Sequence, residues 1–167
     1  MTNRTIQTVR FLSQEDAGDC EPYPNTAMIS IVGPAKPDAS IKPGFHSLLR
    51  LIFDDADEEW LGMPVGSIPD YAPDGGVLIV SDYLMPDLHH AREIVKFIED
   101  GDFEHLVIHC FAGQSRSAAV ARFVSDWYDA ELLLQNHVGT GDKNNRLYRL
   151  LHAAFLERHP GSSNHFV

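Results

Sequence analysis

The chain has 167 residues, 44% of them hydrophobic, which is enough for one domain with a buried core. With 13 Lys and Arg against 24 Asp and Glu, its formal net charge is −11, which argues against nucleic acid or an anionic membrane as the main partner. Its two cysteines cannot make a disulfide framework, and no Cys/His spacing is typical of a zinc site. No stretch has the apolar run of a signal peptide or a membrane span, so we expect a cytoplasmic protein.

In the first half of the chain, apolar runs predict strands separated by turns. The predicted elements are a strand over 5–12, a short helix capped by Ser13, and strands over 26–32 and 47–53. An acidic stretch follows at 54–59. Residues 60–84 are rich in Gly and Pro, which indicates an irregular excursion with a short extra strand at 77–80.

The second half alternates helices with one compact strand. Apolar residues at helical spacing predict a helix that starts at Pro86–Asp87 and ends before Gly101. A strand over 105–109 and helices over 117–128 and 145–158 follow. No repeat or linker divides the sequence, so we expect 1–167 to fold as a single α/β domain with a mostly parallel central sheet flanked by helices.

The segment between the strand at 105–109 and the next helix carries the chemistry. Its residues are His109, Cys110, Phe111, Ala112, Gly113, Gln114, Ser115, Arg116 and Ser117. A cysteine that is followed by five residues and then an arginine forms a weak pattern by itself. The preceding His, the central Gly and the Ser-Arg-Ser ending make the whole string much more specific, and its place between a strand and a helix is the context that such a motif needs.

A loop of this length can bind an anion. The backbone N–H groups of 111–115 can point to one centre, and the next helix adds the positive end of its dipole. Gly113 gives the backbone freedom to curl, and the planar guanidinium of Arg116 can grip two oxygens of a phosphate. The same positive field favours the thiolate of Cys110, which would lie beneath the phosphate, in line for attack on phosphorus.

The string from His109 to Ser117 resembles the signature of the cysteine-based protein tyrosine and dual-specificity phosphatases, which is His-Cys, five residues, Arg and then Ser or Thr. The resemblance extends loosely over 26–128, and 144–155 is similar to the last helix of the compact bacterial and phage members. It implies a tyrosine-phosphatase-like fold and hydrolysis of phosphotyrosine, or also phosphoserine and phosphothreonine, through a cysteinyl-phosphate intermediate. It further implies that no metal or cofactor takes part, that Ser117 helps the cysteine to leave, and that His109 orders the loop.

The resemblance also implies an aspartic acid that protonates the leaving oxygen. In the compact bacterial members the corresponding segment resembles Phe-x-Asp after a strand, which here is Phe53-Asp54-Asp55. We therefore expect Asp55 to be the acid, with Asp54 as the second candidate. Asp82 competes by its shorter distance in sequence from Cys110, and the 60–84 excursion would explain the longer interval from Asp55.

Other functions use a similar loop. Arsenate reductases and rhodanese-like sulfurtransferases also set a cysteine in an anion-binding loop, and a non-catalytic phosphate-binding module is a third alternative. For the phosphatase, the expected partner is a phosphorylated protein or a small phosphomonoester, and the expected state is a monomer. Cys20 could be a thiol that protects Cys110 after oxidation, but we expect it to be an ordinary packed cysteine.

Overall fold

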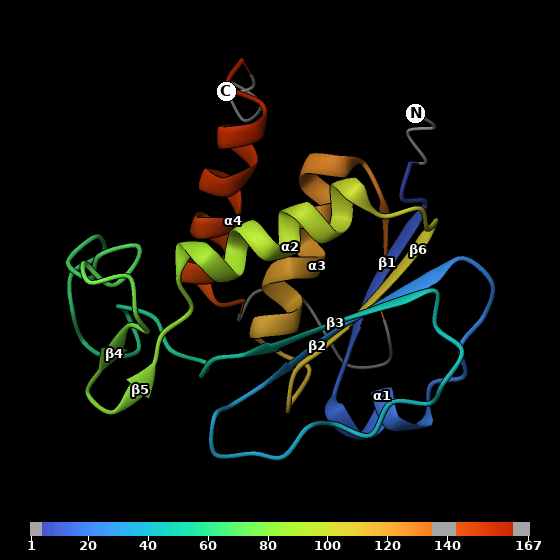
Figure 1. Cartoon of the computed structure of the whole chain (residues 1–167), viewed down its shortest axis with the longest axis horizontal. Helices are drawn as coiled ribbons and strands as arrows, with labels where there is room; N and C mark the ends of the chain where they lie inside the picture. Colours follow the sequence, from blue (N-terminus) through green and yellow to red (C-terminus); the bar gives the residue numbers. More distant parts are fainter. Residues whose placement is uncertain (1–4, 135–142, 162–167) are drawn as a thin grey trace.

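Five strands form one all-parallel sheet in the computed structural model, which describes residues 5–134 and 143–161 (Figure 1). The strand order is β3-β2-β6-β1-β7. The strands are β1 (Thr8–Leu12), β2 (Thr26–Val32), β3 (Ser47–Ile52), β6 (His105–His109) and β7 (Glu131–Leu133). Helices flank the sheet, so the predicted α/β class with a parallel sheet is confirmed.

The helices cover the two faces unequally. They are α1 (Gln14–Asp19), α2 (Leu88–Asp100), α3 (Arg116–Tyr128) and α4 (Asn145–Arg158). Residues of α2, α3 and α4 share one large apolar core with the sheet, whereas α1 packs on a smaller cluster, and Figure 1 shows it on the opposite side. In the described part of the chain, none of these helices has the length and apolar composition needed to cross a bilayer.

The register of the parallel strands decides which loops meet. All seven residues of β2 are buried, as expected for a strand covered on both faces. In the ladders, β6 pairs with β1 so that His109 lies beside Leu12, and with β2 so that His109 lies beside Ser30. The segments that follow β1 and β6 therefore leave the sheet at the same edge.

The structure differs from the sequence-based expectation mainly in its shortest elements. The strand β7 was not predicted, because three residues after a helix carry too little pattern to be recognised. The extra strand expected at 77–80 is the two-residue β4 (Ile79–Val80), which pairs with an unpredicted β5 (Tyr83–Leu84). The turn between them places Ser81 and Asp82 at positive φ.

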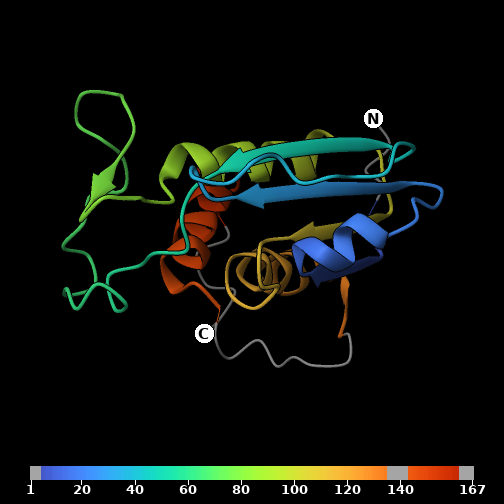
Figure 2. The same ribbon diagram turned by 90° about the horizontal axis from the view of Figure 1, so that it is seen from below.

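The 60–84 excursion folds outside the sheet, where it carries β4 and β5 at one end of the molecule (Figures 1 and 2). Arg146 of α4 fastens it and is 1% exposed. Its Nη1 donates to Oε1 of the buried Glu58 at 2.7 Å. Its Nη2 donates to the carbonyl of Pro69 at 2.8 Å, and its Nε to that of Pro86 at 2.8 Å. One buried guanidinium therefore binds the chain at three points: before the excursion, within it and after it.

Replacing Arg146 with Met should lower the free energy of unfolding by about 3 kcal/mol, the low end of the range for a broken buried ion pair. The low end applies because the partly exposed Arg149 still contacts Glu58. The matched control is Arg92→Met, which breaks an ion pair with Glu157 whose side chains are both about half exposed, and it should cost less than about 1 kcal/mol. Urea denaturation measures both, and equal losses would contradict the anchoring role of Arg146.

Candidate active site

The loop 110–116 joins the carboxyl end of β6 to the first turn of α3, and the β1–α1 junction supports it from beneath. The Cys110 N–H donates to the Leu12 carbonyl at 3.3 Å, and the Gln14 N–H donates to the Phe111 carbonyl at 3.1 Å. Gly113 has φ +69°, and a Cβ added there would lie 2.5 Å from the backbone nitrogen of Ser13. A side chain at position 113 would therefore meet backbone in a conformation that already favours glycine.

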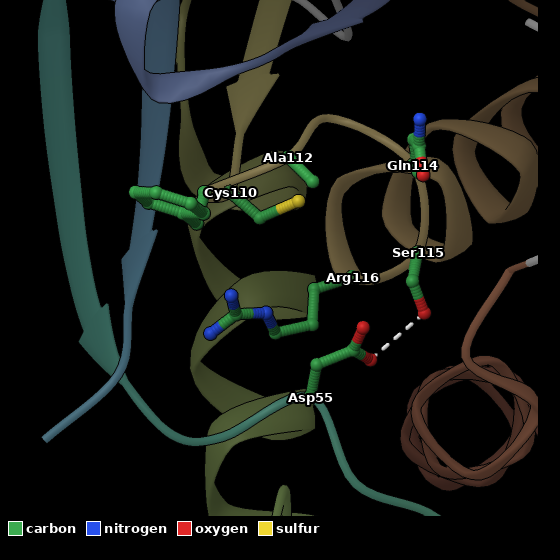
Figure 3. A pocket seen from close by; sticks show the side chains of 7 residues that line it. Asp55, Cys110, Ala112, Gln114, Ser115 and Arg116 are labelled. Atoms are coloured by element: carbon green, nitrogen blue, oxygen red, sulfur yellow. Dashed lines mark hydrogen bonds between the residues drawn. The ribbon is translucent and has the colours of Figure 1, made fainter. Parts of the chain in front are cut away.

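The loop encloses a pocket of about 450 Å³ (Figure 3). The residues that line it are Asp55, Cys110, Phe111, Ala112, Gln114, Ser115 and Arg116. Cys110 is only 2% exposed, and its Sγ lies 3.1 Å from Oγ of the fully buried Ser117. Of the other residues expected at the site, Gly113 packs on the β1–α1 junction and His109 lies behind the loop in β6.

Arg116 gives the pocket a cationic wall. Figure 3 shows its side chain between those of Cys110 and Asp55, and the residue is 8% exposed. Its Nη1 donates to the carbonyl of Phe53 at 2.8 Å, while its Nε is buried and has no hydrogen-bond partner among the described residues. A buried donor without an acceptor is costly unless something else accepts from it. Arg116 therefore suits a site that binds an anion.

The start of α3 adds to this preference for an anion. Ser115 is the N-cap residue, yet its side chain makes no capping hydrogen bond to the helix. Its hydroxyl instead donates to Oδ1 of Asp55 at 2.8 Å. The first N–H groups of α3 thus lack the side-chain acceptor that most helices have, and the positive end of the helix dipole lies at the pocket.

Asp55 faces this pocket from the segment that follows β3. Its Oδ1 accepts hydrogen bonds from Ser115 and from Nδ2 of Asn144, and its other oxygen points toward the space beside Cys110 (Figure 3). The two competing candidates lie elsewhere. Asp54 accepts a hydrogen bond from the Leu84 N–H at 2.7 Å, and Asp82 lies in the β4–β5 turn. Among the three, only Asp55 lines the pocket.

His109 supports the loop from the sheet. Its Nδ1 lies 3.3 Å from the carbonyl of Cys110, and its Nε2 lies 2.6 Å from Oγ of the buried Ser30 on β2. A carbonyl can only accept, so the proton belongs on Nδ1, and the Ser30 hydroxyl then donates to Nε2. Burial lowers the pKa of His109, and the hydrogen bond to the Cys110 carbonyl opposes this effect only in part. The lowered pKa also favours the neutral ring.

Sequence reasoning missed two of these polar residues, Ser30 and Asn144. Ser30 lies inside an apolar strand, where nothing in the pattern marks it as a partner of His109. Asn144 directly precedes the predicted helix over 145–158, so it could have been recognised as an N-cap. Its contact with Asp55 spans 89 residues and has no local signal.

Cys20 packs where an ordinary apolar residue would. It belongs to the smaller core cluster with Leu12, Ala17 and Met28, whereas Cys110 belongs to the larger cluster. Its Sγ accepts a hydrogen bond from Nη2 of Arg10 at 3.0 Å. Cys20 is the C-cap residue of α1, the helix on the side of the sheet opposite α2, α3 and α4.

No protein-family model, curated protein or solved structure matches the chain. Within residues 5–134 and 143–161, no group of three or more His, Cys, Asp or Glu side chains could hold a metal ion.

The lowered pKa of His109 predicts a pH-dependent stability. Below about pH 6.5 this histidine binds a proton in the unfolded chain, whereas His109 in the folded protein stays neutral to a lower pH. The free energy of unfolding should therefore fall as the pH decreases, by at most about 1.4 kcal/mol per pH unit. Urea denaturation of the wild type and of His109→Gln at pH 5 and pH 7.5 measures this, and the variant should show the weaker dependence. His89→Gln, at an exposed position, controls for loss of one imidazole, and equal pH dependence in wild type and His109→Gln would contradict the assignment.

Proposed function

We propose that the protein is a cysteine-dependent phosphatase of the tyrosine and dual-specificity type. It would hydrolyse phosphotyrosine monoesters, with phosphoserine and phosphothreonine as further candidate substrates, in a phosphorylated protein or a small phosphomonoester. The observation that carries the proposal is a single pocket lined by a thiol, a buried guanidinium and a carboxyl group, from Cys110, Arg116 and Asp55. The strand-loop-helix setting of the loop is consistent with a tyrosine-phosphatase-like fold.

In the first step the thiolate of Cys110 attacks phosphorus, the S–P bond forms and the bond from phosphorus to the ester oxygen breaks. Arg116 and the N–H groups at the start of α3 hold the phosphoryl oxygens and stabilise the charge of the transition state. Asp55 gives its proton to the leaving oxygen, so that the alcohol departs neutral.

In the second step water attacks the phosphorus of the cysteinyl phosphate, and the S–P bond breaks. Asp55, now a carboxylate, takes a proton from the water, and inorganic phosphate is released. The hydroxyl of Ser117, 3.1 Å from Cys110 Sγ, can donate a hydrogen bond to the departing thiolate. The enzyme thereby returns to its starting state without a metal or a cofactor in either step.

The alternative activities have less support from the pocket. Arsenate reduction needs electrons from a further thiol, and Cys20 belongs to a different core cluster from Cys110. Sulfur transfer and simple phosphate binding have no use for a proton donor, whereas Asp55 is held at the pocket by two hydrogen bonds. A carboxyl group opposite the thiol favours ester hydrolysis.

The purified protein should hydrolyse p-nitrophenyl phosphate in the presence of EDTA, and vanadate should inhibit it. Cys110→Ser should reduce turnover to the background rate, because the hydroxyl is a far weaker nucleophile at neutral pH. Cys20→Ser is the matched control and should keep the wild-type rate. Turnover retained in Cys110→Ser would remove the nucleophile assignment.

Asp55→Asn should slow hydrolysis of an alkyl phosphate by about 10²–10⁴-fold, the usual contribution of a general acid. The kcat/KM for an activated aryl ester, which reports the first step alone, should fall much less, since its leaving group departs without a proton. Asp82→Asn, which changes a carboxylate in the exposed β4–β5 turn, should leave both rates unchanged. If Asp82→Asn instead showed the selective loss, Asp55 would not be the acid.

A further inference from the structure

Asn144 is 2% exposed and connects α4 with both sides of the pocket. Asn144 is the N-cap residue of α4, and its Oδ1 accepts a hydrogen bond from the Leu147 N–H at 2.9 Å. Its Nδ2 donates to Oδ1 of Asp55 at 3.0 Å and to the carbonyl of Ala56 at 3.1 Å, and its backbone N–H donates to the carbonyl of Ser115 at 3.1 Å. Both polar atoms of its side chain therefore have a partner.

These contacts fix the orientation of the amide. The Leu147 N–H can only donate, so the atom facing it must be the amide oxygen. The amide nitrogen must then face Asp55 and Ala56. A rotated amide would set its oxygen against two acceptors and its NH₂ group against a donor, so Asn144 presents donors to Asp55 in a fixed direction.

The hydrogen bonds on Asp55 decide which of its oxygens can carry a proton. Oδ1 accepts from both Ser115 and Asn144, and a carboxyl oxygen has two lone pairs. With both lone pairs of Oδ1 in use, the proton of the acid form belongs on Oδ2. That is the oxygen that Figure 3 shows pointing toward the space beside Cys110.

We propose that Asn144 is a positioning residue that directs the proton of Asp55 to the oxygen facing the substrate. The inference rests on the proposed phosphatase function and adds a residue that the cysteine–arginine motif does not contain. Ser115 shares the contact, but its hydroxyl can rotate and it belongs to the loop that would close around phosphate. The amide of Asn144 cannot rotate in this way and does not belong to the loop, since its contacts with the Leu147 N–H of α4 and with the Ala56 carbonyl hold it in place.

The test compares Asn144→Asp and Asn144→Ser, because Asp and Ser both retain an N-cap oxygen for α4. Asp replaces the amide donors with an acceptor at nearly constant size, and Ser removes them. Both variants should lose about tenfold or more in kcat/KM for an alkyl phosphate, as expected for a misplaced catalytic group. Both should keep a kcat/KM close to that of the wild type on an activated aryl ester, and Asn144→Ser should remain folded at the assay temperature, because Ser keeps the N-cap oxygen.

A double-mutant cycle separates positioning from a general structural effect. In the Asp55→Asn background, Asn144→Ser should cause no further loss on the alkyl phosphate, because its effect passes through Asp55. Parallel losses on both esters, or a full additional loss in the Asp55→Asn background, would overturn the role of Asn144 while leaving the phosphatase function intact. If the wild type turned over neither ester, the proposed function would fail, and this inference with it.

Discussion

The parallel pairing of β6 between β1 and β2 determines where the chemistry can occur. Parallel strands release their following loops at one edge of a sheet, and ligands of open α/β sheets bind in the crevice there. In this chain the segments after β1, β3 and β6 meet at that edge and supply the supporting turn, Asp55 and the thiol loop respectively. The same register sets Ser30 beside His109, so a slip of β2 by one residue would remove the partner of the imidazole that holds the Cys110 carbonyl.

Arg116 links this arrangement to anion binding. Its contact with the Phe53 carbonyl joins the thiol loop to the segment that carries Asp55, so the Cys110 thiol and the Asp55 carboxyl group are linked through one buried side chain. Among residues 5–134 and 143–161, Arg116 has no ion pair and its Nε has no acceptor, which is unfavourable for a buried guanidinium. Under the proposed function, a phosphate in the pocket would supply both the charge and the acceptor.

Hydrophobic periodicity was sufficient to predict the main strands and helices, because burial on one or both faces leaves a local pattern. The thiol loop was predictable for a different reason, since all of its residues are contiguous in sequence. The contacts that organise the rest of the site are not local. Asn144 meets Asp55 across 89 residues and Arg146 meets Glu58 across 88, and neither side chain follows any period that could indicate its partner.

The first turn of α4 explains how Asp55 keeps its position although the 60–84 excursion lies between it and Cys110. Long surface insertions cost little in loop-closure entropy. An insertion whose ends are not held in place could, however, shift the residues that flank it. Asn144 holds Asp55 and Ala56, and two residues later Arg146 holds Glu58 and the carbonyls of Pro69 and Pro86. Both the start and the return of the excursion are therefore tied to the same helix end. The position of the Asp55 carboxyl group relative to the Cys110 thiol therefore depends on the first turn of α4 as well as on the sheet.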